Sequence, residues 1–270
     1  PPSMDLLQLL RNISQNQLGI RLLNIYKGLP ISYDTNITSV GFSEIQVPGS
    51  KNHIACLYYQ GESYLQVEGL PFVIRSTVKS LNLAKNYAVL TDFEAVKNNI
   101  GKREQIRVEP DDPISVSIQF KDSAYDFPAP LADISTNGAS VFFDDFLFPT
   151  RLAVPGNEFT MTITIPDFVV RKMKKTPPQH SVNVNRKMAT PFRPSSTSGQ
   201  DGEITIKANG KVISILQEKE LNRYRVSAQV FFKDLSRMVI LQYISHRQAE
   251  IIKDLRILSE DLYNNKNNTR

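Results

Sequence analysis

The sequence contains one cysteine, Cys56, and only three histidines among its 270 residues. A single cysteine excludes an internal disulfide framework and any zinc site built on several thiolates. The histidines His53, His180 and His246 are far apart in the sequence, so we expect no metal and no resident cofactor. No stretch approaches the roughly 20 consecutive apolar residues of a membrane helix. We therefore expect a cytoplasmic protein without membrane insertion.

Positive charge is unevenly distributed along the chain. Lys and Arg number 32 against 27 Asp and Glu, a formal charge of +5. Residues 171–200 hold seven of the basic residues and no acidic one, which leaves 25 basic against 27 acidic residues, or −2, elsewhere. The basic segment is rich in proline and serine, and we interpret about residues 171–202 as a disordered insert between strands. The overall basicity is therefore no sign of an anionic ligand.

Hydrophobic patterning predicts a mainly β protein. Apolar spacings of three and four predict an amphipathic helix from residue 4 to about 26, interrupted near Gly19. A second helix is predicted over 235–258, with Asp234 as its N-cap. Short β-branched and aromatic runs between turn residues predict two sets of strands. The first set covers 31–33, 37–47, 53–59, 63–67, 72–78 and 87–93; the second covers 105–108, 114–120, 131–134, 139–143, 159–165, 203–206, 211–216 and 224–232.

These elements predict two small antiparallel β-barrels with an N-terminal helical segment and a long C-terminal helix. We place an N-terminal split-barrel-like domain at 4–97 and a junction at 98–108. A second barrel domain follows at 103–260 and contains the basic insert.

Two short motifs accompany the second set of strands. An Arg-x-x-x-Arg pair, Arg103 and Arg107, lies in the junction, and an Asp-x-Ser-x-x-Gly motif begins at Asp133 and includes Ser135 and Gly138. With fifteen arginines in the chain, about one Arg-x-x-x-Arg pair is expected by chance. Both motifs in this order, about thirty residues apart and each followed by strands, are a much more specific signal.

The two motifs resemble those of the PilZ domain, a family of receptors for the bacterial second messenger cyclic di-GMP. With the strand-rich domain that precedes it, the chain is similar to the two-domain flagellar-brake type. The resemblance implies that Arg103, Arg107, Asp133, Ser135 and Gly138 bind cyclic di-GMP. It also implies a protein partner, such as a component of the flagellar motor.

The chemistry of these side chains fits such a ligand. A guanidinium can pair with phosphate, hydrogen-bond guanine or stack on a purine face. The Asp133 carboxylate can accept from guanine N1–H and its amino group, and Ser135 can donate to a phosphate or support the turn. Gly138 permits close approach of the backbone or a positive φ. Lys102 adds positive charge nearby, although no family motif fixes it.

The sequence is also compatible with other interpretations. Arg103 and Arg107 could be solvated residues at a strand edge, and 133–138 could be only a turn. The basic insert could instead bind single-stranded nucleic acid through Lys172, Lys174, Lys175, Arg186, Lys187 and Arg193. A degenerate PilZ scaffold would act through protein contacts alone, and a homodimer is also compatible with the sequence. The chain has no P-loop, Gly-x-Gly-x-x-Gly or Gly-x-Ser-x-Gly motif, so we expect a receptor that is not an enzyme.

Overall fold

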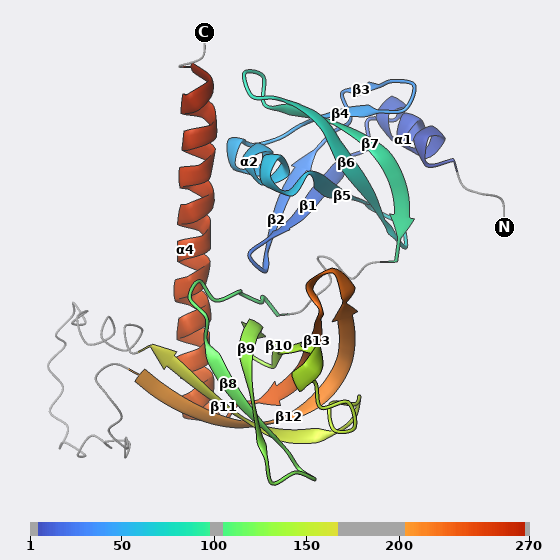
Figure 1. The fold of residues 1–270 in the computed structure, drawn as a ribbon. Coiled ribbons are helices and arrows are strands. Elements are labelled where there is room, and N and C mark those ends of the chain that lie inside the picture. The colour runs from blue at the N-terminus through green and yellow to red at the C-terminus, as the bar shows by residue number, and fades with distance from the viewer. Residues whose placement is uncertain (1–4, 98–104, 167–202, 268–270) are drawn as a thin grey trace, which may run out of the picture. The chain divides into compact units, whose positions relative to one another are not determined.

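The computed structural model describes residues 5–97, 105–166 and 203–267. The chain divides into two compact units, residues 1–108 with 247–270, and residues 109–246. The predicted mainly β architecture with a short N-terminal helix and a long C-terminal helix is confirmed (Figure 1). The basic residues of the segment 171–200 lie outside the described residues. In the part of the chain that is described, no helix is both long and apolar enough to span a membrane.

The first unit is built on a seven-stranded antiparallel sheet with the strand order β2-β1-β5-β6-β7-β4-β3. Two helices pack with this sheet, and buried residues of both helices join the strands in one hydrophobic core. The elements are α1 (Leu6–Gln15), β1 (Ile20–Tyr26), β2 (Leu29–Thr35), β3 (Ser39–Val40), β4 (Ile45–Pro48), α2 (Lys51–Gln60), β5 (Glu62–Val67), β6 (Val73–Asn82) and β7 (Tyr87–Val96).

Two sequence predictions in this unit were wrong. The predicted N-terminal helix ends at Gln15, and the apolar run after Gly19 is strand β1, buried between β2 and β5. Residues 53–59 form helix α2 instead of a strand. Ser50 caps that helix by accepting from the backbone N–H of His53, and Gly61 ends it in the left-handed conformation at φ 69°. Because consecutive residues of α2 are buried, its sequence lacks the alternation of apolar and polar residues every three to four positions that identifies a helix.

The last part of the C-terminal helix α4 (Asp234–Asn267) belongs to the first unit. Leu255 packs against Ala55 and Cys56 of α2. Lys27 Nζ lies 2.9 Å from the Asp254 carboxylate, and the Tyr263 hydroxyl donates to the side chain of Asn86. Helix α4 is therefore a structural element of both units, with residues up to 246 counted in the second.

The second unit contains a closed six-stranded antiparallel barrel with the strand order β10-β13-β12-β11-β8-β9 (Figure 1). One of its strands, β12, runs unbroken where two separate strands were predicted. The predicted strand at 105–108 does not form, and only Val108 of that range makes an isolated bridge. The elements are β8 (Ser115–Phe120), β9 (Asp126–Ser135), β10 (Gly138–Asp144), the 3-10 turn η1 (Asp145–Leu147), β11 (Glu158–Pro166), β12 (Glu203–Glu218), the 3-10 turn η2 (Lys219–Leu221), β13 (Arg223–Phe231) and the start of α4.

The interior of the barrel is packed with apolar side chains from alternate positions of its strands. The space left among them is about 10 Å³, no more than one water molecule needs. The side chains around it are those of Ile118, Phe120, Ala139, Val141, Phe159, Met161, Val212, Val226 and Ala228. A ligand of this unit must therefore bind to its outer surface.

Gly210 is the point where β12 has no room for a side chain. It pairs with Phe159, and a Cβ at this position would lie 2.7 Å from Phe159 Cε2 and 3.0 Å from the Gln229 carbonyl oxygen. We expect Gly210→Ala to lower the free energy of unfolding by about 1–3 kcal/mol, because the buried ring must shift. Hydrogen exchange of the barrel amides, recorded at increasing urea concentrations, measures this loss of stability. Gly19→Ala is the control, because its Cβ would meet only Asn36 Oδ1 at 3.9 Å; equal losses in both variants would contradict the prediction.

Candidate functional site

The Asp-x-Ser-x-x-Gly motif forms the hairpin between β9 and β10. Ser135 pairs with Gly138, so that Thr136 and Asn137 make a two-residue loop. The Ser135 hydroxyl is 3.3 Å from Asn137 Oδ1 and 3.2 Å from the Gly138 carbonyl oxygen, and it donates within this loop. The Val230 backbone N–H also donates to the Asn137 carbonyl oxygen at 3.0 Å. Ser135 thus supports the turn, which was one of its two predicted roles.

Gly138 does not adopt the positive φ that was offered as one reason for a glycine at this position. Among the described residues, the glycines with positive φ are Gly28, Gly61, Gly69 and Gly156. Gly138 is buried at the start of β10. Close approach of the backbone to a ligand stays a prediction for this residue.

A bulge in β9 gives Asp133 its orientation. Ser140 of β10 is opposite Asp133, but its neighbour Val141 is opposite Leu131, so β9 holds one extra residue at this point. Because Val141 points into the barrel, Ser140 and Asp133 point to the outer surface. The Asp133 side chain is nevertheless only 3% exposed. A carboxylate with so little access to water requires charged or polar partners.

Arg225 of β13 is one such partner of Asp133. Its Nη2 donates to Asp133 Oδ2, and its side chain keeps 30% of its surface exposed. The two residues meet because β10 pairs with β9 on one side and with β13 on the other. Ser140 and Ser227 continue this polar row across the same strands, with their hydroxyl oxygens 3.1 Å apart. The guanidinium fixes the direction of the carboxylate at the outer surface of the barrel.

An aromatic ring between two arginines extends the site along β10. The guanidinium carbon of Arg223 lies 3.6 Å from the centre of the Phe142 ring, and that of Arg225 lies 5.7 Å from it. Both are cation–π distances. The Glu218 carboxylate also accepts from Arg223 at 2.6 Å. Together with Asp133 this group can recognise a planar ligand that carries both hydrogen-bond donors and negative charge.

The structure places the predicted site residues in different parts of the chain. It brings Asp133, Ser135 and Gly138 together in the second unit, whereas Arg107 is a half-buried residue of the first. Lys102 and Arg103 lie outside the described residues.

Arg225, Arg223 and Phe142 were not predicted from the sequence as residues of the site. The alternation of polar and apolar residues in β13 is visible in the sequence and places Arg225 on the outer surface. The pairing of β13 with β10, which brings Arg225 to Asp133, is not visible there.

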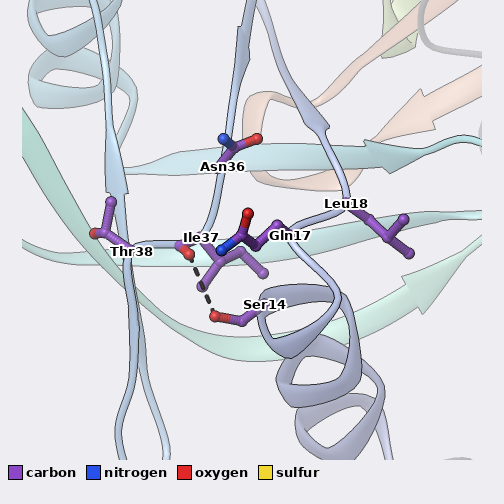
Figure 2. Close-up of a pocket in the computed structure, with 6 residues that line it drawn as sticks. All are labelled: Ser14, Gln17, Leu18, Asn36, Ile37 and Thr38. Carbon is purple, nitrogen blue, oxygen red and sulfur yellow. Dashed lines mark hydrogen bonds between the residues drawn. The ribbon is translucent and has the colours of Figure 1, made fainter.

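A separate cavity of about 340 Å³ lies in the first unit (Figure 2). It is found where α1 ends beside the link between β2 and β3, and the Ser14 hydroxyl donates to the Ile37 carbonyl oxygen there at 3.2 Å. Its lining residues are Ser14, Gln17, Leu18, Asn36, Ile37 and Thr38. None of them carries a charge, so this cavity does not match a phosphate-bearing ligand.

No family model and no curated protein matches the chain. Among solved structures, the Bacillus subtilis inhibitor of motility (MotI/DgrA) is similar at 13% identity and a TM-score of 0.37, over 87% of this chain and 97% of its own. YcgR from Escherichia coli in complex with c-di-GMP is similar at 14% identity and a TM-score of 0.36. This match covers 95% of the present chain and 93% of the YcgR chain. The structure of the PilZ domain of Escherichia coli YcgR with c-di-GMP is similar at 14% identity and a TM-score of 0.34. This match covers 57% of the present chain and 96% of that domain.

Proposed function

We propose that this protein is a non-enzymatic receptor for cyclic di-GMP that passes the signal to a protein partner in the control of motility. The observation that carries the proposal is the Asp133 carboxylate, nearly buried on the outer surface of the barrel and oriented by Arg225. A fixed carboxylate accepts two hydrogen bonds from the Watson–Crick edge of guanine, whereas adenine presents an acceptor at the corresponding ring nitrogen. This difference favours a guanine ligand.

Arg103 and Arg107 complete the proposed site from the junction. Each guanidinium can pair with one phosphate of the dianion or stack on a guanine. In this proposal Ser135 and Gly138 hold the hairpin that presents Asp133, and Lys102 contributes charge alone. The interactions of the two arginines with bound ligand would favour one arrangement of the two domains over others.

The change in domain arrangement is a separate part of the proposal. Small-angle scattering by the full chain should give a smaller radius of gyration when saturating cyclic di-GMP is added. Identical scattering curves with and without ligand, under conditions where binding is complete, would contradict it.

Arg225→Met tests the role of the guanidinium that orients Asp133. We expect the affinity for cyclic di-GMP to fall about tenfold, because a charge-assisted hydrogen bond stabilises the carboxylate in its binding direction. Arg225→Lys retains the charge and should lose less. Calorimetric titration gives both affinities.

The control for Arg225 is a similar ion pair in the first unit. Arg21 donates to the Asp34 carboxylate at 2.6 Å on an exposed surface. Arg21→Met should leave the affinity unchanged, and thermal unfolding should show that both variants are folded. An Arg225→Met protein with wild-type affinity would show that Arg225 has no part in the site.

A further inference from the structure

Two short 3-10 turns lie together at one end of the six-stranded barrel. The turn η1 follows β10, the turn η2 joins β12 to β13, and the Asp145 backbone N–H donates to the Asn222 carbonyl oxygen at 3.1 Å. Three large apolar side chains on these turns face solvent. Phe146 is 83% exposed, Leu147 53% and Leu221 60%, and we call these three residues the end patch.

The turns that carry the end patch are packed against the barrel by aromatic contacts. Phe148, directly after η1, stacks on Tyr224 of β13 with ring centres 4.0 Å apart and planes 13° from parallel. It also contacts the buried Phe143 edge to face at 6.2 Å. The turns are therefore anchored in the barrel while their apolar side chains point outwards. A group of exposed large apolar side chains on a fixed surface is typical of an interaction site.

Acidic residues outnumber basic ones in the two short segments that carry the end patch. Asp144, Asp145, Glu218 and Glu220 occur in the segments 144–147 and 218–223, against Lys219 and Arg223, a formal charge of −2. Arg223 is already paired with Glu218 at 2.6 Å. Asp144, Asp145 and Glu220 are exposed beside the apolar side chains. The complementary surface would combine apolar side chains with Lys or Arg.

We propose that the end patch binds a segment of another protein in which apolar side chains are flanked by basic ones. Phe146 would be the central anchor, because a large aromatic ring contributes most when it enters a pocket of its partner. The carboxylates would select a basic partner and raise its association rate. This inference rests on the proposed function in that it supplies the partner of a receptor, but its test needs no nucleotide.

The test uses two synthetic helical peptides of 18 residues, one of Leu and Lys and one of Leu and Glu. We expect the full-length protein to bind the Leu–Lys peptide with micromolar affinity, and amide NMR shifts to be confined to residues 144–148 and 218–223. The double variant Phe146→Ser, Leu221→Ser should bind it at least tenfold more weakly. The control double variant Phe42→Ser, Leu235→Ser removes a phenylalanine that is 93% exposed and a leucine that is 65% exposed elsewhere, and should bind as the wild type does.

Three results would overturn the proposal. The first is equal affinity of the end-patch and control variants for the Leu–Lys peptide, and the second is equal binding of the Leu–Glu peptide. The third is a dimer in sedimentation that the end-patch variant alone converts to a monomer, which would make a second copy the occupant. The peptide experiment contains no nucleotide. A negative result in it therefore does not bear on the proposed cyclic di-GMP site, and a negative result in the cyclic di-GMP titrations does not bear on the end patch.

Discussion

Asp133→Ala should lower the affinity for cyclic di-GMP by about 100-fold, or about 2.7 kcal/mol. The reason is that the nearly buried carboxylate, fixed by Arg225, is the acceptor proposed for the donor edge of guanine. Calorimetric titration of the full-length protein measures the loss. Asp133→Asn keeps the size of the side chain and should lose nearly as much, because the amide has one acceptor in place of two.

Asp126 is the matched control for Asp133. It is an exposed carboxylate at the other end of the same strand, β9. Asp126→Ala should therefore leave the affinity unchanged. If Asp133→Asn and Asp126→Ala both bound as tightly as the wild type, Asp133 would not belong to the site.

The first unit should lose stability in acid because of His53. This side chain is 1% exposed on α2, and neither of its ring nitrogens has a hydrogen-bond partner among the described residues. Burial lowers the pKa of His53 from 6.5 to about 4. Below pH 6.5 His53 is therefore protonated in the unfolded chain but stays neutral in the folded chain. The free energy of unfolding falls as the pH drops from 6.5 to about 4. The full decrease in the free energy of unfolding is about 3 kcal/mol.

His53→Leu removes this titration and should flatten the pH dependence over the same interval. Hydrogen exchange of the α2 amides at several pH values between 7 and 4 gives the local stability. An unchanged slope in His53→Leu would mean that other groups cause the acid sensitivity.

The sequence predicted the strand content well and the helical boundaries poorly. Most predicted strands are present because their turn residues and alternation are local signals. Strand β1 was assigned to a helix because a buried strand and a helix share continuous apolar runs. Helix α2 was assigned to a strand for the same reason, although its cap Ser50 and its terminal Gly61 were visible in the sequence.

The candidate site could be predicted only as far as it is local in the sequence. Asp133, Ser135 and Gly138 occur within six residues, and the hairpin between β9 and β10 brings them together. Arg225 is 92 residues from Asp133 and reaches it only because the barrel closes through β13. The bulge that turns Asp133 outwards is also a property of strand pairing. Neither feature has a local signature.

Titration of the full-length wild-type protein with cyclic di-GMP is the most direct test of the proposed function. We expect saturable binding of cyclic di-GMP, at least 100-fold weaker binding of cyclic di-AMP, and no measurable binding by the double variant Arg103→Ala, Arg107→Ala. No binding of cyclic di-GMP by the folded wild-type protein would contradict the receptor function and would favour a scaffold that acts through protein contacts alone.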